Sequence, residues 1–229
     1  MKNDKYTTLL LDVDGTLLDF NAAERYGVCT VMEHFGLTPT QERVERYHQV
    51  NLEYWKAFER GEISRDNIFA NRYHRFFAEY GMDVESSEAE PLYRSRLNSC
   101  AILLPDALEI CRYLRSRYDL YIITNGISET QYRRLRDSGL DEYFTDIFVS
   151  EDAGSQKPQK EFFDYCFLRI REKDPSQMLI IGDSLSSDIR GGKNAGIATC
   201  WLDDGSQQMA TDLKPDYVIH ALEELKTFL

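Results

Sequence analysis

The 229-residue sequence has no long hydrophobic run, no C-x-x-C pair and no excess of basic residues. No apolar run approaches the roughly 20 residues of a membrane-spanning helix, and the one near the N-terminus is too short for a signal peptide. Lys and Arg number 27 against 39 Asp and Glu, a formal charge of −12. We therefore expect no binding to membranes or to nucleic acid polymers. A small anionic substrate is not excluded, because the local charge of a site can oppose the net charge.

The five cysteines are an odd number and lie scattered along the chain. They argue against a disulfide framework or a zinc site and are typical of reduced thiols, so we expect a cytoplasmic protein. A hydrophobic content of 42% and a charged content of 29% are ordinary for a globular protein. The length fits one large domain or one domain with an insertion.

Short β-rich runs alternate with helical segments in the second half of the chain, and one further run lies near the start. The helical segments include 161–171 and one after residue 127, where Ser128 and Gln131 fit a capping box. Alternation with short connections predicts a parallel sheet covered on both faces. The predicted strands are 7–12, 120–124, 145–150, 178–183, 197–202 and 217–219.

The strand signal disappears between about residues 19 and 100, where helical patches with start and stop signals take over. We predict an α/β protein with a doubly wound, Rossmann-like parallel sheet made of residues 1–18 and 101–229. An all-helical insertion, residues 19–100, follows the first strand. Its four helices are predicted to end near Gly36, to run from Thr38-Pro39 to Gly61, to run from an N-cap at Ser64 to Gly81, and to follow the acidic stretch ESSEAE.

The stretch LLLDVDGTLLDF ends a predicted strand in two carboxylates, Asp12 and Asp14, followed by Gly15 and Thr16. Strand alternation places residues i and i+2 on the same side. Two like charges there are costly unless a positive charge lies between them or one carboxyl keeps its proton. Because D-x-D-G is also a turn sequence, this motif alone fits a turn and a site equally well.

Three other predicted strands also lead into polar residues. LYIIT ends at Thr124, with Asn125 next; Lys157 follows the strand TDIFVS; and MLIIGD ends at Asp183, with Asp188 five residues on. Taken singly, each has a purely structural interpretation: Thr124 fits a strand terminus, Lys157 a solvated loop lysine, and the G-D-S stretch at Asp183 a turn with an N-cap. Ligands of open parallel sheets bind beyond the carboxyl ends of the strands, so we expect the four ends to form one site.

The ordered set D-x-D-G-T, a hydrophobic run with T-N-G, K-P and G-D-x-x-x-x-D resembles the haloacid dehalogenase-like hydrolase superfamily. The resemblance covers the whole predicted sheet domain. It implies a Rossmann-like core, Mg²⁺ and phosphoryl transfer through an aspartyl-phosphate. In this superfamily a helical insertion between the first two motifs is the first cap type, which closes over small phosphate esters.

The resemblance also implies roles for the acidic residues. Asp12 becomes the nucleophile, since a carboxylate can form an acyl-phosphate. The Mg²⁺ ligands become the Asp12 carboxylate, the Asp14 backbone carbonyl and Asp183, with Asp188 in support. The side chain of Asp14 then acts as general acid to the leaving alkoxide and as base to the hydrolytic water.

The remaining motif residues are expected to bind phosphate. Thr124 and Asn125 hold its oxygens, and Lys157 neutralises the charge that develops on them. Members of the superfamily that cleave carbon–halogen bonds lack the second aspartate, because no alkoxide needs a proton. The presence of Asp14 therefore favours a phosphatase over a dehalogenase.

Three longer stretches resemble the pyrimidine 5′-nucleotidase branch of the superfamily: VNLEYWKAFERGEIS, FVSEDAGSQKPQKEFFDYC and GDSLSSDIRGGKNAGIATCWL. That branch removes phosphate from nucleoside monophosphates. Most aromatic residues of the insertion are expected in its core, but one or two that face the cleft can stack on a base. Asn51, Trp55 and Arg72 are the predicted substrate contacts of the cap.

These observations predict a cytoplasmic, Mg²⁺-dependent phosphomonoesterase, a monomer or homodimer, whose substrate is a small phosphorylated metabolite such as a nucleoside monophosphate. The alternatives are a phosphatase of organic acids or sugar phosphates such as phosphoglycolate, and a phosphomutase. A third alternative is a binding protein on the same fold that has no enzymatic activity. The intact set of motif residues argues against it.

Overall fold

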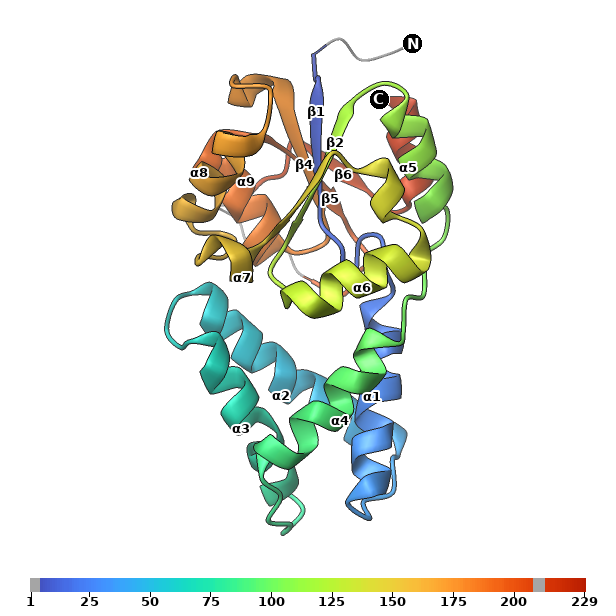
Figure 1. Ribbon diagram of the computed structural model, residues 1–229, viewed down its shortest axis with the longest axis vertical. Coiled ribbons are helices and arrows are strands. Elements are labelled where there is room, and N and C mark those ends of the chain that lie inside the picture. The colour runs from blue at the N-terminus through green and yellow to red at the C-terminus, as the bar shows by residue number, and fades with distance from the viewer. Residues whose placement is uncertain (1–4, 208–212) are drawn as a thin grey trace. The chain divides into compact units, whose positions relative to one another are not determined.

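The computed structural model describes residues 5–207 and 213–229. By its internal contacts the chain divides into two units (Figure 1). The sheet unit comprises Met1–Asp19 and Ala101–Leu229, and the helical unit comprises Phe20–Cys100. Within the described ranges, no helix combines the length and the apolar character needed to cross a lipid bilayer.

The sheet unit is built on a parallel sheet with the strand order β3-β2-β1-β4-β5-β6 over the described residues. Every strand coincides with a predicted run to within two residues, because these runs are the apolar, β-branched segments that a buried parallel strand requires. The strands are β1 (Thr8–Leu11), β2 (Asp119–Thr124), β3 (Asp146–Val149), β4 (Met178–Gly182), β5 (Ala198–Leu202) and β6 (Tyr217–Ile219).

Helices cover both faces of this sheet, so the doubly wound α/β prediction is confirmed. Leu9 and Leu11 point to the face covered by α5, α6 and η4, whereas Leu10 points to the face covered by α8. The helical elements of this unit are α5 (Ala107–Arg115), α6 (Ser128–Ser138), η1 (Asp141–Tyr143), α7 (Ser150–Ala153), α8 (Lys160–Arg169), η2 (Pro175–Gln177), the π-helix η3 (Leu185–Ile189), α9 (Arg190–Ala195) and η4 (Leu222–Thr227).

The order of the strands creates a switch point beside β1. The chain passes from β1 to β2 and β3 on one side, and β4 to β6 then lie on the other side. Connections that leave β1 and β4 in opposite directions open a crevice at their carboxyl ends, where open α/β sheets bind ligands. Asp12 follows β1 and Asp183 follows β4, so both stand at this crevice.

The predicted capping box at the start of α6 is wrong. The N-cap position is Ile127, whose side chain has no acceptor for the first turn. The Ser128 hydroxyl instead donates to Asp152 Oδ1 at 2.6 Å, and Glu151 Oε2 accepts from the Ser128 backbone N–H at 2.7 Å. The acidic start of α7 therefore supplies hydrogen-bond partners for the start of α6, and this leaves the side chain of Gln131 available for another contact.

The helical unit contains α1 (Phe20–His34), α2 (Gln41–Glu59), α3 (Arg65–Ala78) and α4 (Ser86–Asn98). Ser64 caps α3 as predicted, accepting from the Asn67 N–H at 3.2 Å, whereas α2 is capped by Thr40 and not by Thr38. Four partly buried aromatic residues, Phe20, Phe35, Tyr54 and Tyr80, pack against the core of the unit, and the core itself contains five buried aromatic rings. They are Tyr47, Tyr73, Phe76, Phe77 and Tyr93.

The two chain segments that connect the units pair with each other inside the sheet unit. Leu18 and Leu103 form an antiparallel bridge. The Asp19 N–H donates to the Ile102 carbonyl at 2.8 Å, and the Leu104 N–H donates to the Leu17 carbonyl at 2.9 Å. The outgoing and returning segments thus form a short two-stranded ribbon, which we call the linker ribbon.

Candidate active site

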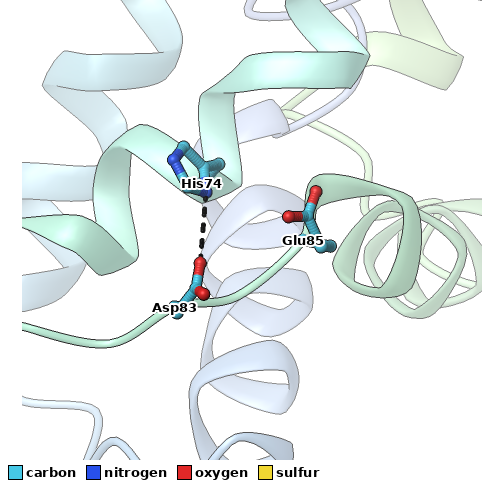
Figure 2. A group of neighbouring side chains, drawn as sticks. All are labelled: His74, Asp83 and Glu85. Atoms are coloured by element: carbon cyan, nitrogen blue, oxygen red, sulfur yellow. Dashed lines mark ion pairs between the residues drawn. The ribbon is translucent and has the colours of Figure 1, made fainter.

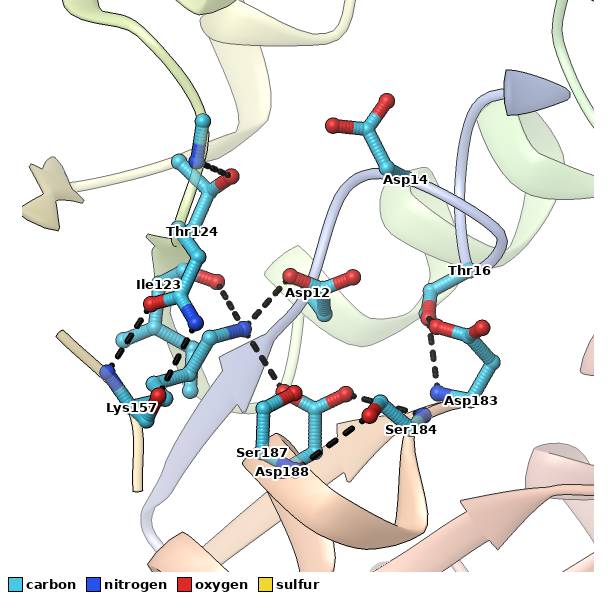
Figure 3. Close-up of polar contacts among 12 residues, drawn as sticks. Asp12, Asp14, Thr16, Ile123, Thr124, Lys157, Asp183, Ser184, Ser187 and Asp188 are labelled. Carbon is cyan, nitrogen blue, oxygen red and sulfur yellow. Dashed lines mark hydrogen bonds and ion pairs between the residues drawn. The ribbon is translucent and has the colours of Figure 1, made fainter. Parts of the chain in front are cut away.

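The predicted site residues of the sheet unit lie together at the carboxyl edge of the sheet (Figure 3). Asp12 follows β1, Thr124 ends β2, and Asp183 follows β4. Lys157 lies between α7 and α8 and reaches the same place with its ammonium group. Segments more than 140 residues apart in sequence therefore supply one polar cluster.

Lys157 is the centre of this cluster. Its Nζ donates to Asp12 Oδ1 at 2.6 Å, to Asp188 Oδ1 at 2.6 Å and to the Ile123 carbonyl at 3.0 Å, which uses all three hydrogens. Burial alone would lower the pKa of Lys157, but the two carboxylates outweigh it and hold the pKa above its usual range. The lysine is therefore a fixed, buried positive charge.

Three carboxylates gather near that single charge. Asp12, Asp183 and Asp188 each offer an oxygen, and these oxygens lie within 4.8 Å of one another. Burial raises the pKa of Asp12 to about 7, with Lys157 opposing the shift and Asp188 adding to it. Burial and the two neighbouring carboxylates also raise the pKa of Asp183 well above its usual value. One lysine does not balance the negative charge of three carboxylates. Carboxylate oxygens are also the ligands that Mg²⁺ prefers, so the residues fit a divalent cation.

Asp183 is fixed by contacts on both sides. The Thr16 hydroxyl accepts from the Asp183 N–H at 3.1 Å and lies 3.2 Å from Asp183 Oδ1. The Asp183 carbonyl accepts from Trp201 Nε1 at 2.7 Å and from Gln207 Nε2 at 2.9 Å. Gly15, at φ +80°, leaves no room for a side chain, because a Cβ would lie 2.6 Å from Asp183 Oδ2. This close approach explains the glycine after the acidic pair.

Asp188 has both carboxylate oxygens engaged within the protein. Oδ1 accepts from Lys157, and Oδ2 accepts from the Ser184 backbone N–H at 3.1 Å. The side chain is fully buried. We propose that it supports the site by orienting Lys157 and the loop that carries Asp183.

The loop after β2 supplies two further predicted residues. The Thr124 hydroxyl accepts from the Gly126 N–H at 3.1 Å and from Gln131 Nε2 at 2.9 Å, which orients its own hydrogen toward another acceptor. The Asn125 side chain accepts from the Lys157 N–H at 2.8 Å and donates to the Lys157 carbonyl at 2.9 Å. Asn125 thus joins two loops, and its contact with substrate stays a prediction.

Asp14 has two partners that the sequence did not indicate. Arg134 Nη1 donates to Asp14 Oδ1 at 2.5 Å, and Gln131 Nε2 donates to Asp14 Oδ2 at 2.5 Å. Both partners come from one face of α6, three residues apart. The available signal was a Gln and an Arg at this spacing in a helix that begins at the carboxyl edge of the sheet.

Two of the predicted cap contacts lie in a buried polar network within the helical unit. Arg72 pairs with Glu90 at 2.6 Å and donates to Asn51 Oδ1 at 2.8 Å, and Asn51 Nδ2 donates to Glu24 Oε1 at 2.6 Å. These bonds hold both side chains inside the unit, so the structure does not favour them as substrate contacts. Trp55 is partly exposed and packs against Phe58, and its role stays a prediction.

A second group of metal-ligating residue types brings together a residue of α3 and two residues of the segment between α3 and α4. His74, Asp83 and Glu85 have ligand atoms within 4.8 Å of one another (Figure 2). His74 Nδ1 lies 3.9 Å from Asp83 Oδ1, and both side chains are at least half exposed. Water screens charges at such exposed positions, so the two carboxylates of this group repel each other only weakly. This group therefore needs a bound cation less than the buried cluster does.

Comparison with known proteins agrees with the fold and with the motif set. The family model of the haloacid dehalogenase-like hydrolases matches residues 6–196. The HAD-hydrolase YfnB of Bacillus subtilis is 43% identical over 96% of this chain and 94% of its own. A crystal structure of YfnB bound to magnesium has a TM-score of 0.94 and covers 99% of each chain.

Two relatives carry a named activity. The pyrimidine 5′-nucleotidase PynA of Streptococcus pneumoniae is 35% identical over 96% of this chain and 93% of its own. The pyrimidine 5′-nucleotidase YjjG of Escherichia coli is 30% identical over 98% of each chain.

Proposed function

The chain belongs to the haloacid dehalogenase-like hydrolases, and we propose that it is a phosphomonoesterase that works through an aspartyl-phosphate on Asp12. The observation that carries this proposal is the buried Asp12 carboxylate held by Lys157, with a second carboxylate, Asp14, two residues on and held by separate partners. One carboxylate can attack phosphorus while the other handles protons.

The residues suggest a two-step reaction. In the first step an Asp12 oxygen attacks the phosphorus of the ester, the bond from phosphorus to the leaving oxygen breaks, and Asp14 gives that oxygen a proton. In the second step Asp14 takes a proton from water, whose oxygen attacks the phosphorus. The bond from phosphorus to the Asp12 oxygen breaks, phosphate is released, and the Asp12 carboxylate and the protonated Asp14 are restored. Thr124 donates to a phosphate oxygen, and Lys157 offsets the charge on the others.

We propose Mg²⁺ as the cofactor, held by Asp12, Asp183 and the backbone carbonyl of Asp14. Bound there, it would supply the positive charge that lets an anionic carboxylate meet an anionic phosphate. The buried carboxylate cluster supports this assignment, as does the magnesium in the crystal structure of YfnB. Asp14 also separates the proposed reaction from carbon–halogen cleavage, which produces a halide that needs no proton.

For the substrate we propose a pyrimidine nucleoside 5′-monophosphate. The support is the likeness over nearly the full chain to PynA and YjjG. The test is phosphate release from nucleoside monophosphates, sugar phosphates and phosphoglycolate, with Mg²⁺ and with EDTA. We expect the highest kcat/KM for pyrimidine monophosphates. Preferential release from a non-nucleotide would keep the chemistry and reject the nucleotidase assignment.

Trp55→Ala tests whether the helical unit contacts the base. If Trp55 stacks on the base, we expect the variant to raise KM for nucleotides about tenfold and to leave sugar phosphates unchanged, since stacking contributes about 1–3 kcal/mol. Leu52→Ala, at an exposed position on the same helix, is the matched control. An equal loss for both substrate classes would contradict the stacking role.

The raised pKa of Asp12 predicts how metal affects stability. Its ordinary value is 3.8 and its value in the fold is about 7, so between these pH values the native state keeps a proton that the unfolded state has lost. Stability of the metal-free protein therefore falls as pH rises through this window. Mg²⁺ competes with protons for the same oxygens, so it is expected to raise the melting temperature more at pH 8 than at pH 5.

This expectation is checked by thermal unfolding at both pH values, in EDTA and in Mg²⁺, with Asp12→Asn alongside. In EDTA the variant should gain stability relative to the unmodified protein as the pH increases. The same Mg²⁺ shift at both pH values would contradict the proposed ligand set.

A further inference from the structure

Asp14 is held by two side chains that close a triangle of hydrogen bonds. Arg134 Nη1 bonds Asp14 Oδ1, Gln131 Nε2 bonds Asp14 Oδ2, and Arg134 Nη1 also lies 3.3 Å from Gln131 Oε1. Each carboxylate oxygen thus has its own donor. Two bonds to two oxygens fix both the position and the rotation of a carboxylate, which a single bond does not.

The two donors are themselves held firmly. Arg134 is fully buried and Gln131 is 1% exposed, although both are polar and lie on a helix. The next residue of α6, Leu135, belongs to the core on this face of the sheet. The start of the helix is tied to α7 through Ser128. Burial of a guanidinium group is costly unless the group is paired. The ion pair with the partly exposed Asp14 offsets part of that cost for Arg134.

Gln131 also connects the two chemical functions of the site. The same Nε2 that bonds Asp14 donates to the Thr124 hydroxyl at 2.9 Å. Figure 3 shows the Asp14 carboxylate directed away from Asp12. In phosphoryl transfer the attacking and leaving oxygens are roughly in line on opposite sides of phosphorus, so a proton donor for the leaving oxygen has to stand apart from the nucleophile.

We propose that Arg134 and Gln131 are positioning residues for proton transfer: they hold the Asp14 carboxylate where it meets the leaving oxygen in the first step and the water in the second. The inference rests on the proposed phosphatase function. It adds two residues on α6 that act through Asp14 and do not touch the phosphate. Since the side chain of Asp14 acts only where a proton moves, the loss of Arg134 should be selective for such steps.

The selectivity can be measured with leaving groups of different basicity. An alkyl phosphate needs a proton on its leaving oxygen, whereas p-nitrophenolate leaves without one. For Arg134→Met we expect kcat to fall about tenfold or more on the best alkyl phosphate of the panel, with KM changed less than threefold. General acid–base catalysis contributes about 10²–10⁴-fold, and misplacing the group removes part of it.

With p-nitrophenyl phosphate, Arg134→Met should release the first equivalent of p-nitrophenolate at nearly the unmodified rate. Slow turnover then follows, because hydrolysis of the aspartyl-phosphate still needs Asp14. Gln131→Met should show the same slow turnover after a fast first equivalent, with KM raised as well because Gln131 also donates to Thr124, and it tests the inference if Arg134→Met does not fold. Arg133→Met is the matched control, since Arg133 neighbours Arg134 but is half exposed and faces Asp137. We expect it to match the unmodified protein on both substrates.

A double variant separates positioning from a general structural role. If Arg134 acts through Asp14, then Asp14→Asn/Arg134→Met is no slower on the alkyl phosphate than Asp14→Asn alone. Additive losses, or a first turnover of p-nitrophenyl phosphate slowed as much as alkyl turnover, would overturn the inference. So would full activity of both Arg134→Met and Gln131→Met while Asp14→Asn is slow. Full activity of Asp14→Asn itself would instead reject the proposed function.

Discussion

Asp12→Asn is expected to lower phosphate release about 10⁴-fold or more, because an amide oxygen does not replace a carboxylate as nucleophile. The variant should stay folded. Lys157 keeps its bonds to Asp188 and to the Ile123 carbonyl, and the substitution removes one of three crowded carboxylates. The measurements are phosphate release under saturating substrate and the thermal unfolding midpoint.

The matched control is Asp164→Asn, an exposed aspartate that pairs with Lys160 four residues earlier. It should retain full activity, which excludes a general effect of the exchange. Asp12→Asn should also still bind inorganic phosphate, measured by calorimetry in Mg²⁺, because Thr124 and Lys157 remain. Turnover within tenfold of the unmodified protein would refute Asp12 as the nucleophile.

Lys157→Met is expected to remove activity on every substrate alike and also to destabilise the protein by about 3 kcal/mol or more. The substitution leaves Asp12 and Asp188 buried without the cation that pairs them. Breaking a buried pair by removing one partner is far more costly than losing an exposed pair. Denaturant unfolding at neutral pH in EDTA measures the loss.

Two further variants test whether unpaired buried charge causes the loss of stability. Lys160→Met, which removes an exposed lysine three residues on, should change stability by less than about 1 kcal/mol. Lys157→Met/Asp188→Asn should recover part of the lost stability without recovering activity, since one of the unpaired charges is gone. If the double variant is no more stable than Lys157→Met, unpaired charge is not the cause of the loss.

The sheet and the edge that carries the candidate site could be predicted because the relevant signals are local. A buried parallel strand is a short apolar run, and its carboxyl end is the next polar residue in sequence. Asp12, Thr124 and Asp183 stand at such ends, so topology alone brings them together. Lys157 could be placed near them, but its bonds to both Asp12 and Asp188 depend on the loop after α7 and were not predictable in detail.

The residues that hold Asp14 and those inside the helical unit escaped prediction for a different reason. Gln131 fitted a capping box with Ser128, and only the competing acidic residues of α7 show why that box does not form. Asn51 and Arg72 were predicted as substrate contacts of the cap. A helix pattern does not distinguish a solvated polar residue from one buried against a partner on another helix. Glu90, the partner of Arg72, lies on α4, and Glu24, the partner of Asn51, lies on α1.

The linker ribbon bears on how the chain reaches its fold. β1 pairs with β2, yet more than 100 residues separate their registered partners Leu11 and Ile122, and closing so long a loop is entropically costly and slow. The intervening α1–α4 segment has a hydrophobic core of its own. If this segment collapses first, the Leu18–Leu103 bridge brings its two ends together, and the loop that remains to be closed becomes short. In that order of events the inserted helices would assist the pairing of β1 with β2 by shortening the loop between them.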